Sequence, residues 1–473
     1  MFRTVTPAAC AVASVALAVV ALGAAPLAAG SAFTAGAPGV GDPYFPLEGN
    51  GGYDVGHYTL DLAYDPAARQ LSGTAHLSAR ATQNLSRFDL DLSGMRVRAV
   101  RVNDVAATFR RAGPELQITP RTGLPRGSAF DVAVSYHGSP KTITGSPIVF
   151  GADYGWQYTP DGAFVGDEPN AARTWFPSND HPSDKATFTF RITVPNNRQV
   201  VANGDLLSRT SANTETTFVW DETSPMATYL ATIDIGRWNL RHGATRGGIA
   251  ETMAVDPALA AQVRSGGVFA QTGDITDFWS RKFGPYPFTS TGAIVDNVPD
   301  VGFSLETQTR PLYGFSPDPG TMSHELSHQW FGDSVSVRTW RNIWLNEGFA
   351  TFASWLWDEH TGGTSTYSIA RETYRGIPAS SQFWNQSIAD PQRDTMFSAA
   401  VYVRGGLTLA ALRHRIGDHD FFALLQRWTT QHRYGSASTS QFVHLAEQVS
   451  GQHLGSFFDT WLWQKTKPPS SAI

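Results

Sequence analysis

The chain has 473 residues, of which 41% are hydrophobic, so it is long enough for two or three domains with substantial cores. Its formal net charge of −5 and sequence pI near 6.2 provide no basic surface for nucleic acid. These values argue against a nucleic-acid-binding protein and favour a globular enzyme that acts on small or peptide substrates.

The first thirty residues have the pattern of a targeting segment. Arg3 is the only charge before a run of eighteen small and apolar residues over 8–25. This order predicts a secretory signal peptide over 1–30, and hence a secreted, extracellular protein with no stable membrane insertion after the signal is removed. An uncleaved membrane anchor is the alternative, since such a run nearly spans a bilayer. The only cysteine, Cys10, lies in this segment, so the mature protein would have no disulfide.

The pattern that follows is typical of a β domain. Residues 31–50 are rich in Gly, Pro and Ala and are predicted to form a flexible segment that leads into the domain. Apolar and polar residues then alternate, which predicts antiparallel strands with one buried face. We therefore expect an N-terminal antiparallel, β-sandwich-like domain over 51–236. The alternating runs cover 58–64, 88–92, 130–136, 188–194 and 229–235.

Residues 237–473 change to a mixed and then mainly helical pattern. This predicts a second, α+β domain. The predicted elements are a helix that begins at Asp256, a helix over 268–282, a strand over 293–295, and a helix between Ser438 and Gly451 with a capping box of Ser438 and Gln441.

The strongest chemical signal is a His324-Glu325-x-x-His328 motif, followed after eighteen intervening residues by Glu347. Two imidazoles at i and i+4 lie on one helix face, where both can reach one Zn²⁺ at about 2.0–2.1 Å. Glu347 on a second helix supplies the third ligand and leaves one position open for water. The motif therefore predicts one catalytic zinc per chain, held by His324, His328 and Glu347, with Glu325 as the general base.

Both ligand-bearing segments carry helical signals. A Pro-Gly pair breaks the chain before Thr321, which is expected to cap the first helix, and Gly332 is expected to end it. Apolar residues then continue around Glu347 to a Gly pair at 362–363, which predicts the second helix.

The residues over 324–333 and the Trp-Leu-Asn-Glu-Gly-Phe-Ala sequence from Trp344 resemble the zinc aminopeptidases related to aminopeptidase N and leukotriene hydrolase. The resemblance extends from 51–58 to the Phe-Asp-Thr-Trp-Leu sequence at 458–462. It implies a thermolysin-like catalytic domain over 237–473 and removal of the first residue from peptides with a free N-terminus. Larger members continue into a long helical domain, so a short form that stops at Ile473 is expected to have a more open site.

The same resemblance implies two acidic residues that bind the α-ammonium of the substrate. Glu306 lies where the family has Gly-x-Met-Glu-Asn, although Phe303 and Thr307 depart from that pattern. A carboxylate there would allow only the first peptide bond to reach the metal. Glu168 matches the position of a second acidic group, with Asp167 as the neighbour most easily confused with it. Without the resemblance, these residues would be interpreted as solvated acids.

Tyr402 stands in a Tyr-Val-Arg-Gly sequence that resembles the family's Tyr-x-Lys-Gly, with Arg404 in place of Lys. The resemblance implies that its phenol stabilises charge that exists only in the transition state, whereas a lone helical Tyr is usually a packing residue. The remaining histidines, including His181, His414 and His419, lack metal-ligand spacing and are expected to be structural or exposed.

The expected reaction is zinc-assisted hydrolysis in which Glu325 moves the proton. A zinc endopeptidase and an epoxide hydrolase are competing interpretations, because related zinc sites serve both reactions, and dependence on a free amine distinguishes them. A secreted peptide- or glycan-binding protein with a structural zinc is a third alternative. The open coordination position beside a general base argues against it.

Overall fold

The computed structural model describes residues 1–4, 6 and 32–470. Residues Phe33–Ile473 belong to one compact unit, which does not include Met1–Ala32. The signal peptide predicted over 1–30 therefore lies almost entirely outside the described residues. Within the described part of the chain, no helix has both the length and the apolar character needed to cross a membrane.

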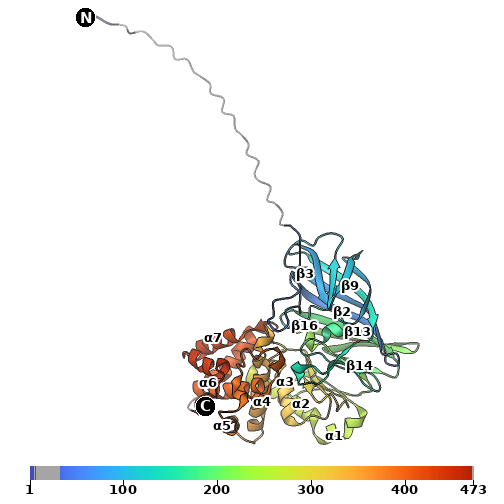
Figure 1. Ribbon diagram of the computed structural model, residues 1–473, viewed down its shortest axis with the longest axis vertical. Helices are drawn as coiled ribbons and strands as arrows, with labels where there is room; N and C mark the ends of the chain where they lie inside the picture. The colour runs from blue at the N-terminus through green and yellow to red at the C-terminus, as the bar shows by residue number, and fades with distance from the viewer. Residues whose placement is uncertain (5, 7–31, 471–473) are drawn as a thin grey trace. The chain divides into compact units, whose positions relative to one another are not determined.

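An eight-stranded sheet forms most of the first half of the compact unit (Figure 1). Its central strands alternate buried and exposed residues, because successive side chains of a strand point to opposite faces. The strands, in order across the sheet, are β15 (Asp205–Ala212), β16 (Glu215–Ala227), β13 (Lys185–Pro195), β2 (Tyr53–Asp65), β3 (Gln70–Ala81), β9 (Ala129–Gly138), β5 (Arg96–Val102) and β6 (Val105–Ala106).

Two smaller sheets accompany the large one. The aromatic side chains of Trp156 and Trp220 are almost completely buried in the core of this half. One sheet has the order β1 (Thr34–Ala35), β4 (Leu85–Asp91), β8 (Glu115–Thr119) and β7 (Thr108–Ala112). The other has the order β10 (Thr142–Ile143), β11 (Tyr154–Tyr158), β12 (Ala163–Gly166), β17 (Ile233–Gly236) and β14 (Gln199–Ala202).

Two details of this half differ from the prediction. β2 pairs with β13 in parallel, so the large sheet is mixed; a parallel pair requires a long connection, and residues 66–184 separate these strands. The strand predicted over 229–235 is instead a 3₁₀ turn, η3 (Thr228–Leu230), followed by the short β17. Every residue over 228–236 is buried, so the alternation in the sequence does not mark a buried and an exposed face there.

The segment predicted to be flexible, over 31–50, contacts both halves of the compact unit where it is described. The Asp42 side chain is buried, and its carboxylate accepts a hydrogen bond from the Trp340 backbone N–H at 2.8 Å. The same carboxylate lies 3.2 Å from Nε2 of His181. The Gly and Pro content thus indicates an irregular backbone, while the buried contacts of Asp42 join this backbone to distant parts of the chain.

The second half combines a mixed sheet with a cluster of helices (Figure 1). The sheet has the order β18 (Asn239–Ala244), β19 (Ala250–Val255), β20 (Ser290–Val295), β22 (Leu312–Tyr313) and β21 (Ser304–Leu305), and β23 (Ser336–Val337) pairs with β24 (Ser436–Ala437). The helices are α1 (Ala260–Ser265), α2 (Val268–Phe283), α3 (Pro319–Ser327), α4 (Trp344–His360), α5 (Thr366–Gly376), α6 (Gly405–Gln431), α7 (Thr439–Ser450) and α8 (Gly455–Phe458). The predicted fold class, a β-rich first half followed by an α+β half, is confirmed.

Most local predictions for this half are also confirmed. α2 and β20 include the predicted ranges, and α7 begins with the capping box, in which the Ser438 N–H donates to Oε1 of Gln441 at 2.9 Å. The helix predicted from Asp256 begins as a 3₁₀ turn, η4 (Pro257–Leu259), that continues into α1. Each of these signals is formed by residues a few positions apart in the sequence. They can therefore be recognised before the tertiary structure is known.

The N-terminal cap of α3 is Asp318, three positions before the predicted Thr321. Its carboxylate accepts hydrogen bonds from the N–H groups of Gly320 at 2.8 Å and Thr321 at 3.1 Å. Pro319 occupies the first helical position, where its fixed φ suits a helix and its missing N–H costs nothing, and the residue before a proline is extended. The proline therefore places the cap at Asp318.

The C-terminal end of α3 also differs from the prediction at Gly332. The helix ends at Ser327, and the backbone continues in a wider turn in which the Asp333 N–H donates to the His328 carbonyl at 3.0 Å. His328 retains helical dihedral angles, φ −59° and ψ −24°. Its side chain therefore remains on the same face as that of His324, although the regular hydrogen bonding has stopped.

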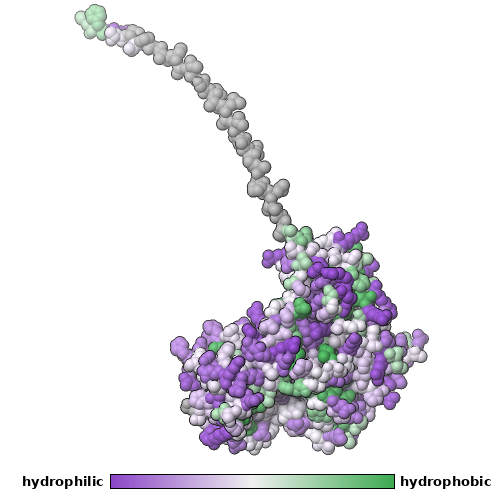
Figure 2. Space-filling model, viewed as in Figure 1, coloured by the Kyte–Doolittle hydropathy of each residue, from purple (hydrophilic) through white to green (hydrophobic). Residues whose placement is uncertain are grey.

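The surface and the interior differ in polarity. Figure 2 shows hydrophilic residues over most of the face in view, with apolar residues in small scattered patches. In the second half, the tryptophans Trp330, Trp344 and Trp428 are almost completely buried. Their burial gives the helical cluster a rigid core that supports the ends of α3 and α4.

Candidate active site

The residues of the predicted zinc motif lie together between α3 and α4. His324 and His328 are neighbours at the end of α3, with ring centroids 4.9 Å apart, and Glu347 comes from the first turn of α4. One carboxylate oxygen of Glu347 lies 3.3 Å from Nε2 of His324 and 3.5 Å from Nε2 of His328. Helical spacing and the position of the second helix thus bring all three side chains to one point.

These distances fit one tetrahedral zinc ion. Ligand atoms bound at about 2.0–2.1 Å with tetrahedral angles are separated by roughly 3.3–3.4 Å, and the three candidate atoms lie within 4.8 Å of one another. The His328 Nδ1–H donates to the Phe331 carbonyl at 2.9 Å, which orients the ring and leaves Nε2 free to bind a metal. Two imidazoles and one carboxylate are the donor set of an open, catalytic zinc site.

Negative charge is concentrated around these ligands. Although burial alone would raise the pKa of Glu347, His328 and His324 lower it to about 2. Burial opposes a charge on His328, yet the carboxylates of Glu347, Glu306 and Glu325 raise its pKa well above the usual range. Several carboxylates therefore lie close to the His328 imidazole. A divalent cation at this point would supply the positive charge that they require.

Glu325 follows His324 on α3 and is 7% exposed. Its carboxylate belongs to a group with Glu306 and His328 whose closest ligand atoms lie within 4.8 Å of one another. Burial raises the pKa of Glu325 well above its usual range, against the opposing charge of His328. A carboxylate with a raised pKa, next to the candidate metal ligands, is chemically suited to accept a proton.

Tyr402 contributes from a third element. It lies within a π-helical turn, η8 (Ala400–Arg404), that leads into α6. Its ring stacks on that of His324, with centroids 6.0 Å apart and an interplanar angle of 12°. Burial raises the pKa of the phenol well above its usual range, and Glu347 adds to the shift, so the hydroxyl stays protonated and can donate a hydrogen bond.

Glu306 and Glu168 meet beside the zinc ligands. Glu306 follows β21 and Glu168 follows β12, and with Glu347 they form a group whose closest oxygens lie within 4.8 Å of one another. Within the described part of the chain, Oε1 of Glu306 and Oε1 of Glu168 are buried without a hydrogen-bond partner. Asp167 is instead bound to Trp175, whose Nε1–H donates to its carboxylate at 2.7 Å. Glu168, and not Asp167, therefore faces the site.

A pocket that sequence reasoning missed adjoins Glu168 and Tyr402. Its volume is about 260 Å³, and four aromatic side chains line it besides that of Tyr402, namely Phe150, Tyr154, Phe303 and Phe397. They come from three segments that are far apart in the sequence, around residues 150–154, 303 and 397, so no local pattern indicates that they meet. The one available signal is Phe303, which departs from the Gly of the family pattern and proves to be a wall of this pocket.

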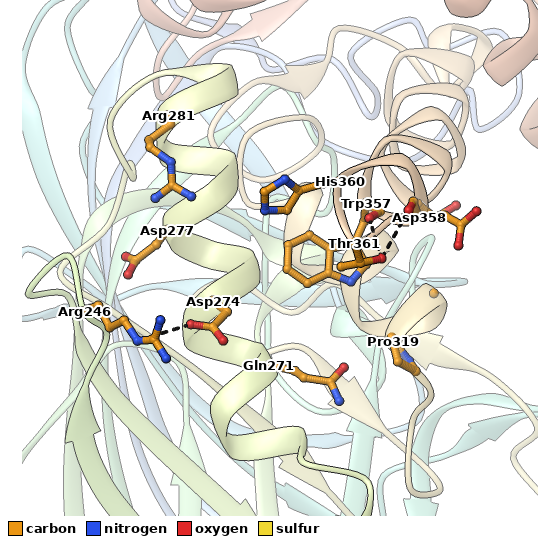
Figure 3. Close-up of a pocket in the computed structure, with 12 residues that line it drawn as sticks. Arg246, Gln271, Asp274, Asp277, Arg281, Pro319, Trp357, Asp358, His360 and Thr361 are labelled. Atoms are coloured by element: carbon orange, nitrogen blue, oxygen red, sulfur yellow. Dashed lines mark hydrogen bonds and ion pairs between the residues drawn. The ribbon is translucent and has the colours of Figure 1, made fainter. Parts of the chain in front are cut away.

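Other sequence-predicted and surface features lie outside this constellation. His181 is buried against Asp42, His414 stacks on Tyr367 and His419 is exposed, in agreement with structural or surface roles. A larger pocket of about 710 Å³ lies between α2 and the end of α4 (Figure 3). Two of the charged residues that line it form an ion pair with each other, since Arg246 lies 3.7 Å from Asp274. None of the described residues that line it belongs to the zinc site.

Comparison with known proteins identifies the family. Residues 319–461 match the Peptidase family M1 domain, and residues 55–230 match the Peptidase M1 N-terminal domain. The crystal structure of an M1 zinc metallopeptidase from Deinococcus radiodurans is similar, with a TM-score of 0.83 and 30% sequence identity, and the match covers 91% of this chain and 98% of that chain. The chain belongs to peptidase family M1.

Other M1 relatives are considerably longer. The chain is 28% identical to Aminopeptidase M1 of Arabidopsis thaliana and 25% identical to Aminopeptidase N of Lactococcus lactis subsp. cremoris. Both alignments cover 64% of this chain, but only 37% and 38% of the respective relatives. The chain thus spans less than half the length of these curated relatives. Membership of this zinc metallopeptidase family and the His324, His328 and Glu347 donor set together identify the metal as zinc.

Proposed function

We propose that the protein is a secreted zinc aminopeptidase that hydrolyses the N-terminal residue from peptides. M1 membership and the donor set support the hydrolytic chemistry. The signal peptide predicted over 1–30 supports secretion. The exopeptidase assignment depends mainly on one observation, the group of buried carboxylates formed by Glu168, Glu306 and Glu347.

These carboxylates require a cation. Zinc accounts for Glu347, but Glu168 and Glu306 are buried and each retains an oxygen without a hydrogen-bond partner among the described residues. An uncompensated buried carboxylate is costly, whereas a charge-assisted hydrogen bond to an ammonium is favourable. The α-ammonium of a free N-terminus has the charge and the donors to satisfy both residues at once.

The chain's own residues then have separate tasks. When bound, zinc supplies a Lewis acid that polarises a carbonyl oxygen and lowers the pKa of water toward about 7. Glu325 accepts the proton of the attacking water and returns it to the leaving amine nitrogen. The Tyr402 hydroxyl donates to the carbonyl oxygen, which becomes an oxyanion as the water adds to the carbonyl carbon. Glu306 and Glu168 hold the α-ammonium so that the first peptide bond lies next to Glu325.

Activity should therefore depend on a free amine. The enzyme should cleave unblocked aminoacyl substrates and leave N-acetylated ones intact, because acetylation removes the cation that the carboxylates bind. Glu306→Ala should lower kcat/KM more than tenfold, since a charge-assisted contact contributes about 1.5–3 kcal/mol. Steady-state kinetics on paired free and N-acetylated fluorogenic substrates measure both effects, with zinc content as the check on folding.

Asp167→Asn is the matched control for Glu168→Gln. Asn can still accept the hydrogen bond from Trp175, so Asp167→Asn should leave kcat/KM within about twofold of wild type, while Glu168→Gln should lower it roughly tenfold. Efficient internal cleavage of an N-blocked peptide by the wild type would overturn the aminopeptidase assignment and favour an endopeptidase.

The aromatic pocket beside Glu168 supports a preference for a large apolar first residue. Glu168 is the only carboxylate among the described residues that line it, and it is already assigned to the α-ammonium. A Deinococcus radiodurans M1 variant has been crystallised with the substrate Tyr-Ser-Ala. Similar two-domain M1 variants have been crystallised with L-arginine and with L-tryptophan. In this chain, the lining by Phe150, Phe303 and Phe397 favours the aromatic and aliphatic side chains over a cationic one.

A panel of aminoacyl substrates should rank leucine and phenylalanine above alanine and arginine. Each buried methylene contributes about 0.8 kcal/mol, so leucine should exceed alanine in kcat/KM by roughly tenfold or more. Phe303→Ala should reduce this ratio, whereas Phe109→Ala, which removes an exposed aromatic from β7, should not. Equal rates for alanine, arginine and leucine would refute this use of the pocket.

A further inference from the structure

Arg404 ends the π-helical turn that carries Tyr402, and its side chain is completely buried. No carboxylate among the described residues forms an ion pair with it. Burial lowers the pKa of this guanidinium to about 10, so it remains charged at neutral pH. A buried cation without an anionic partner requires other strong acceptors.

Backbone carbonyls provide those acceptors. A guanidinium has N–H donors on all three nitrogens, and here each nitrogen has a carbonyl partner. Nε donates to Trp461 at 2.7 Å, Nη1 to Gln386 at 3.0 Å and Trp384 at 3.5 Å, and Nη2 to Thr460 at 3.0 Å and Gln464 at 2.6 Å. The guanidinium also lies 5.6 Å from the ring centroid of Trp384.

These carbonyls lie in, or directly after, two short helices, η6 (Gln382–Asn385) and η9 (Asp459–Trp463). The last carbonyls of a helix have no donor within it and carry the negative end of its dipole, so a cation is favourable there. One side chain therefore joins the turn that contains Tyr402 to two segments that are distant in the sequence.

The C-terminal end of the same turn also packs against α4, the helix that carries Glu347. Gly405 directly follows Arg404, and its backbone meets Gly348, the residue after Glu347. A Cβ placed on Gly405 would lie 2.5 Å from the Gly348 Cα, so α6 approaches α4 as closely as two glycines permit. Two adjacent residues thus fix the turn just after Tyr402, Arg404 through its guanidinium contacts and Gly405 through its close approach to α4.

We propose that Arg404 is a positioning residue for Tyr402. Its hydrogen bonds fix the π-helical turn against residues 384–386 and 460–464, and the fixed turn holds the Tyr402 hydroxyl in place. The proposal rests on the aminopeptidase function proposed above. An oxyanion donor acts only from the correct position, and a misplacement of about 1 Å can cost on the order of 10²-fold in rate. Arg404 should therefore influence turnover without touching the substrate.

A double-mutant cycle tests this role. Lys has three donors on a single nitrogen, so Arg404→Lys cannot reach all of the carbonyls that the guanidinium spans. We expect Arg404→Lys to lower kcat about tenfold with KM and zinc content unchanged. In a Tyr402→Phe background, which lacks the hydroxyl to be positioned, the same substitution should change kcat by less than about twofold.

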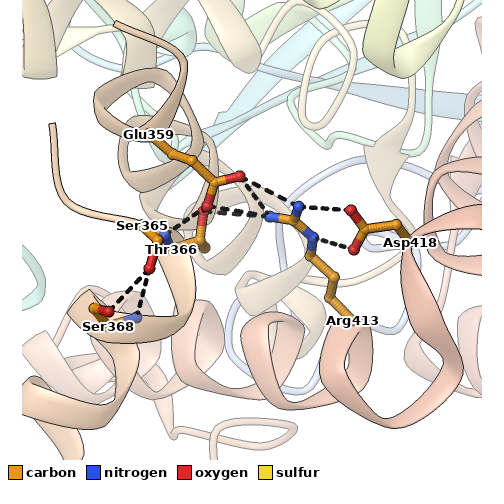
Figure 4. A network of polar contacts seen from close by, with 6 residues as sticks. All are labelled: Glu359, Ser365, Thr366, Ser368, Arg413 and Asp418. Carbon is orange, nitrogen blue, oxygen red and sulfur yellow. Dashed lines mark hydrogen bonds and ion pairs between the residues drawn. The ribbon is translucent and has the colours of Figure 1, made fainter. Parts of the chain in front are cut away.

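Arg413 supplies a matched control on α6, the helix that follows this turn (Figure 4). Its guanidinium lies 3.2 Å from Glu359 and 2.8 Å from Asp418, away from the π-helical turn. Arg413→Lys also removes hydrogen bonds from α6, and it should lower the melting temperature. Its effect on kcat should be within about twofold and equal in the wild-type and Tyr402→Phe backgrounds.

Equal losses of kcat from Arg404→Lys in both backgrounds, or no loss in either, would show that Arg404 is only structural. If Arg404→Lys fails to fold, Trp384→Phe keeps the carbonyl acceptors and removes the indole beside the guanidinium. It should give a smaller loss of kcat that again disappears in the Tyr402→Phe background, and a loss that persists there would overturn the proposal. A wild-type protein that hydrolyses no free-amine substrate would instead contradict the proposed function itself.

Discussion

Glu325→Gln should lower kcat by about 10³-fold or more while the protein retains about one zinc per chain. The amide has the shape of the carboxylate but cannot accept the proton of the attacking water, and a general base contributes roughly 10²–10⁴-fold. His324, His328 and Glu347 are untouched by the change, so metal binding should persist. Steady-state assays with a free-amine substrate measure kcat, and metal analysis of the same sample measures the zinc content per chain.

Glu115→Gln is a suitable control because Glu115 is also buried but belongs to the four-stranded sheet of the first half. It should leave kcat within about twofold of wild type. Chelation should abolish the activity of the wild type, and added zinc should restore it. Loss of zinc from Glu325→Gln, or full activity after chelation, would contradict the assignment of the site.

Tyr402→Phe should lower kcat by about 10²–10³-fold with little change in KM, as expected for loss of one oxyanion donor. The stacking of the ring on His324 does not need the hydroxyl, so the fold and the zinc site should be preserved. The separation of kcat from KM is the informative measurement, because it shows that the hydroxyl acts in the transition state and not in substrate binding.

Tyr136→Phe provides the control for removal of a buried tyrosine hydroxyl. Tyr136 lies on β9, and its hydroxyl has no hydrogen-bond partner among the described residues. Its loss should leave kcat unchanged within about twofold and should not lower stability. An unchanged kcat in Tyr402→Phe would show that Tyr402 is only a packing residue.

The parts of the fold that can be predicted from the sequence are those determined by residues close together in the chain. The range of α2, the strand β20 and the Ser438 capping box all depend on residues a few positions apart, and each is found where it is predicted. The parallel pairing of β2 with β13 is different in kind, because it joins strands separated by residues 66–184. Alternation predicts which face of each strand is buried but not which strand lies beside it.

The candidate site shows the same division. The His324-Glu325-x-x-His328 spacing places both rings on one helix face in any fold that keeps this helix. These two candidate zinc ligands can therefore be predicted from the local sequence alone. The carbonyls around Arg404 come from residues 384–386 and 460–464, and no periodicity connects them. Phe303 and Phe397 likewise meet only through the tertiary fold.

The contacts of Asp42 limit how far the protein can be shortened for expression. The match to the M1 N-terminal domain starts at residue 55, and a version that begins at residue 51 would retain the strands of the large sheet but lose this carboxylate. The Trp340 N–H would then lack its acceptor, four residues before α4 begins at Trp344. Trimming to the family boundary would thus loosen the support of the helix that carries Glu347, and an affinity tag is better attached ahead of residue 33.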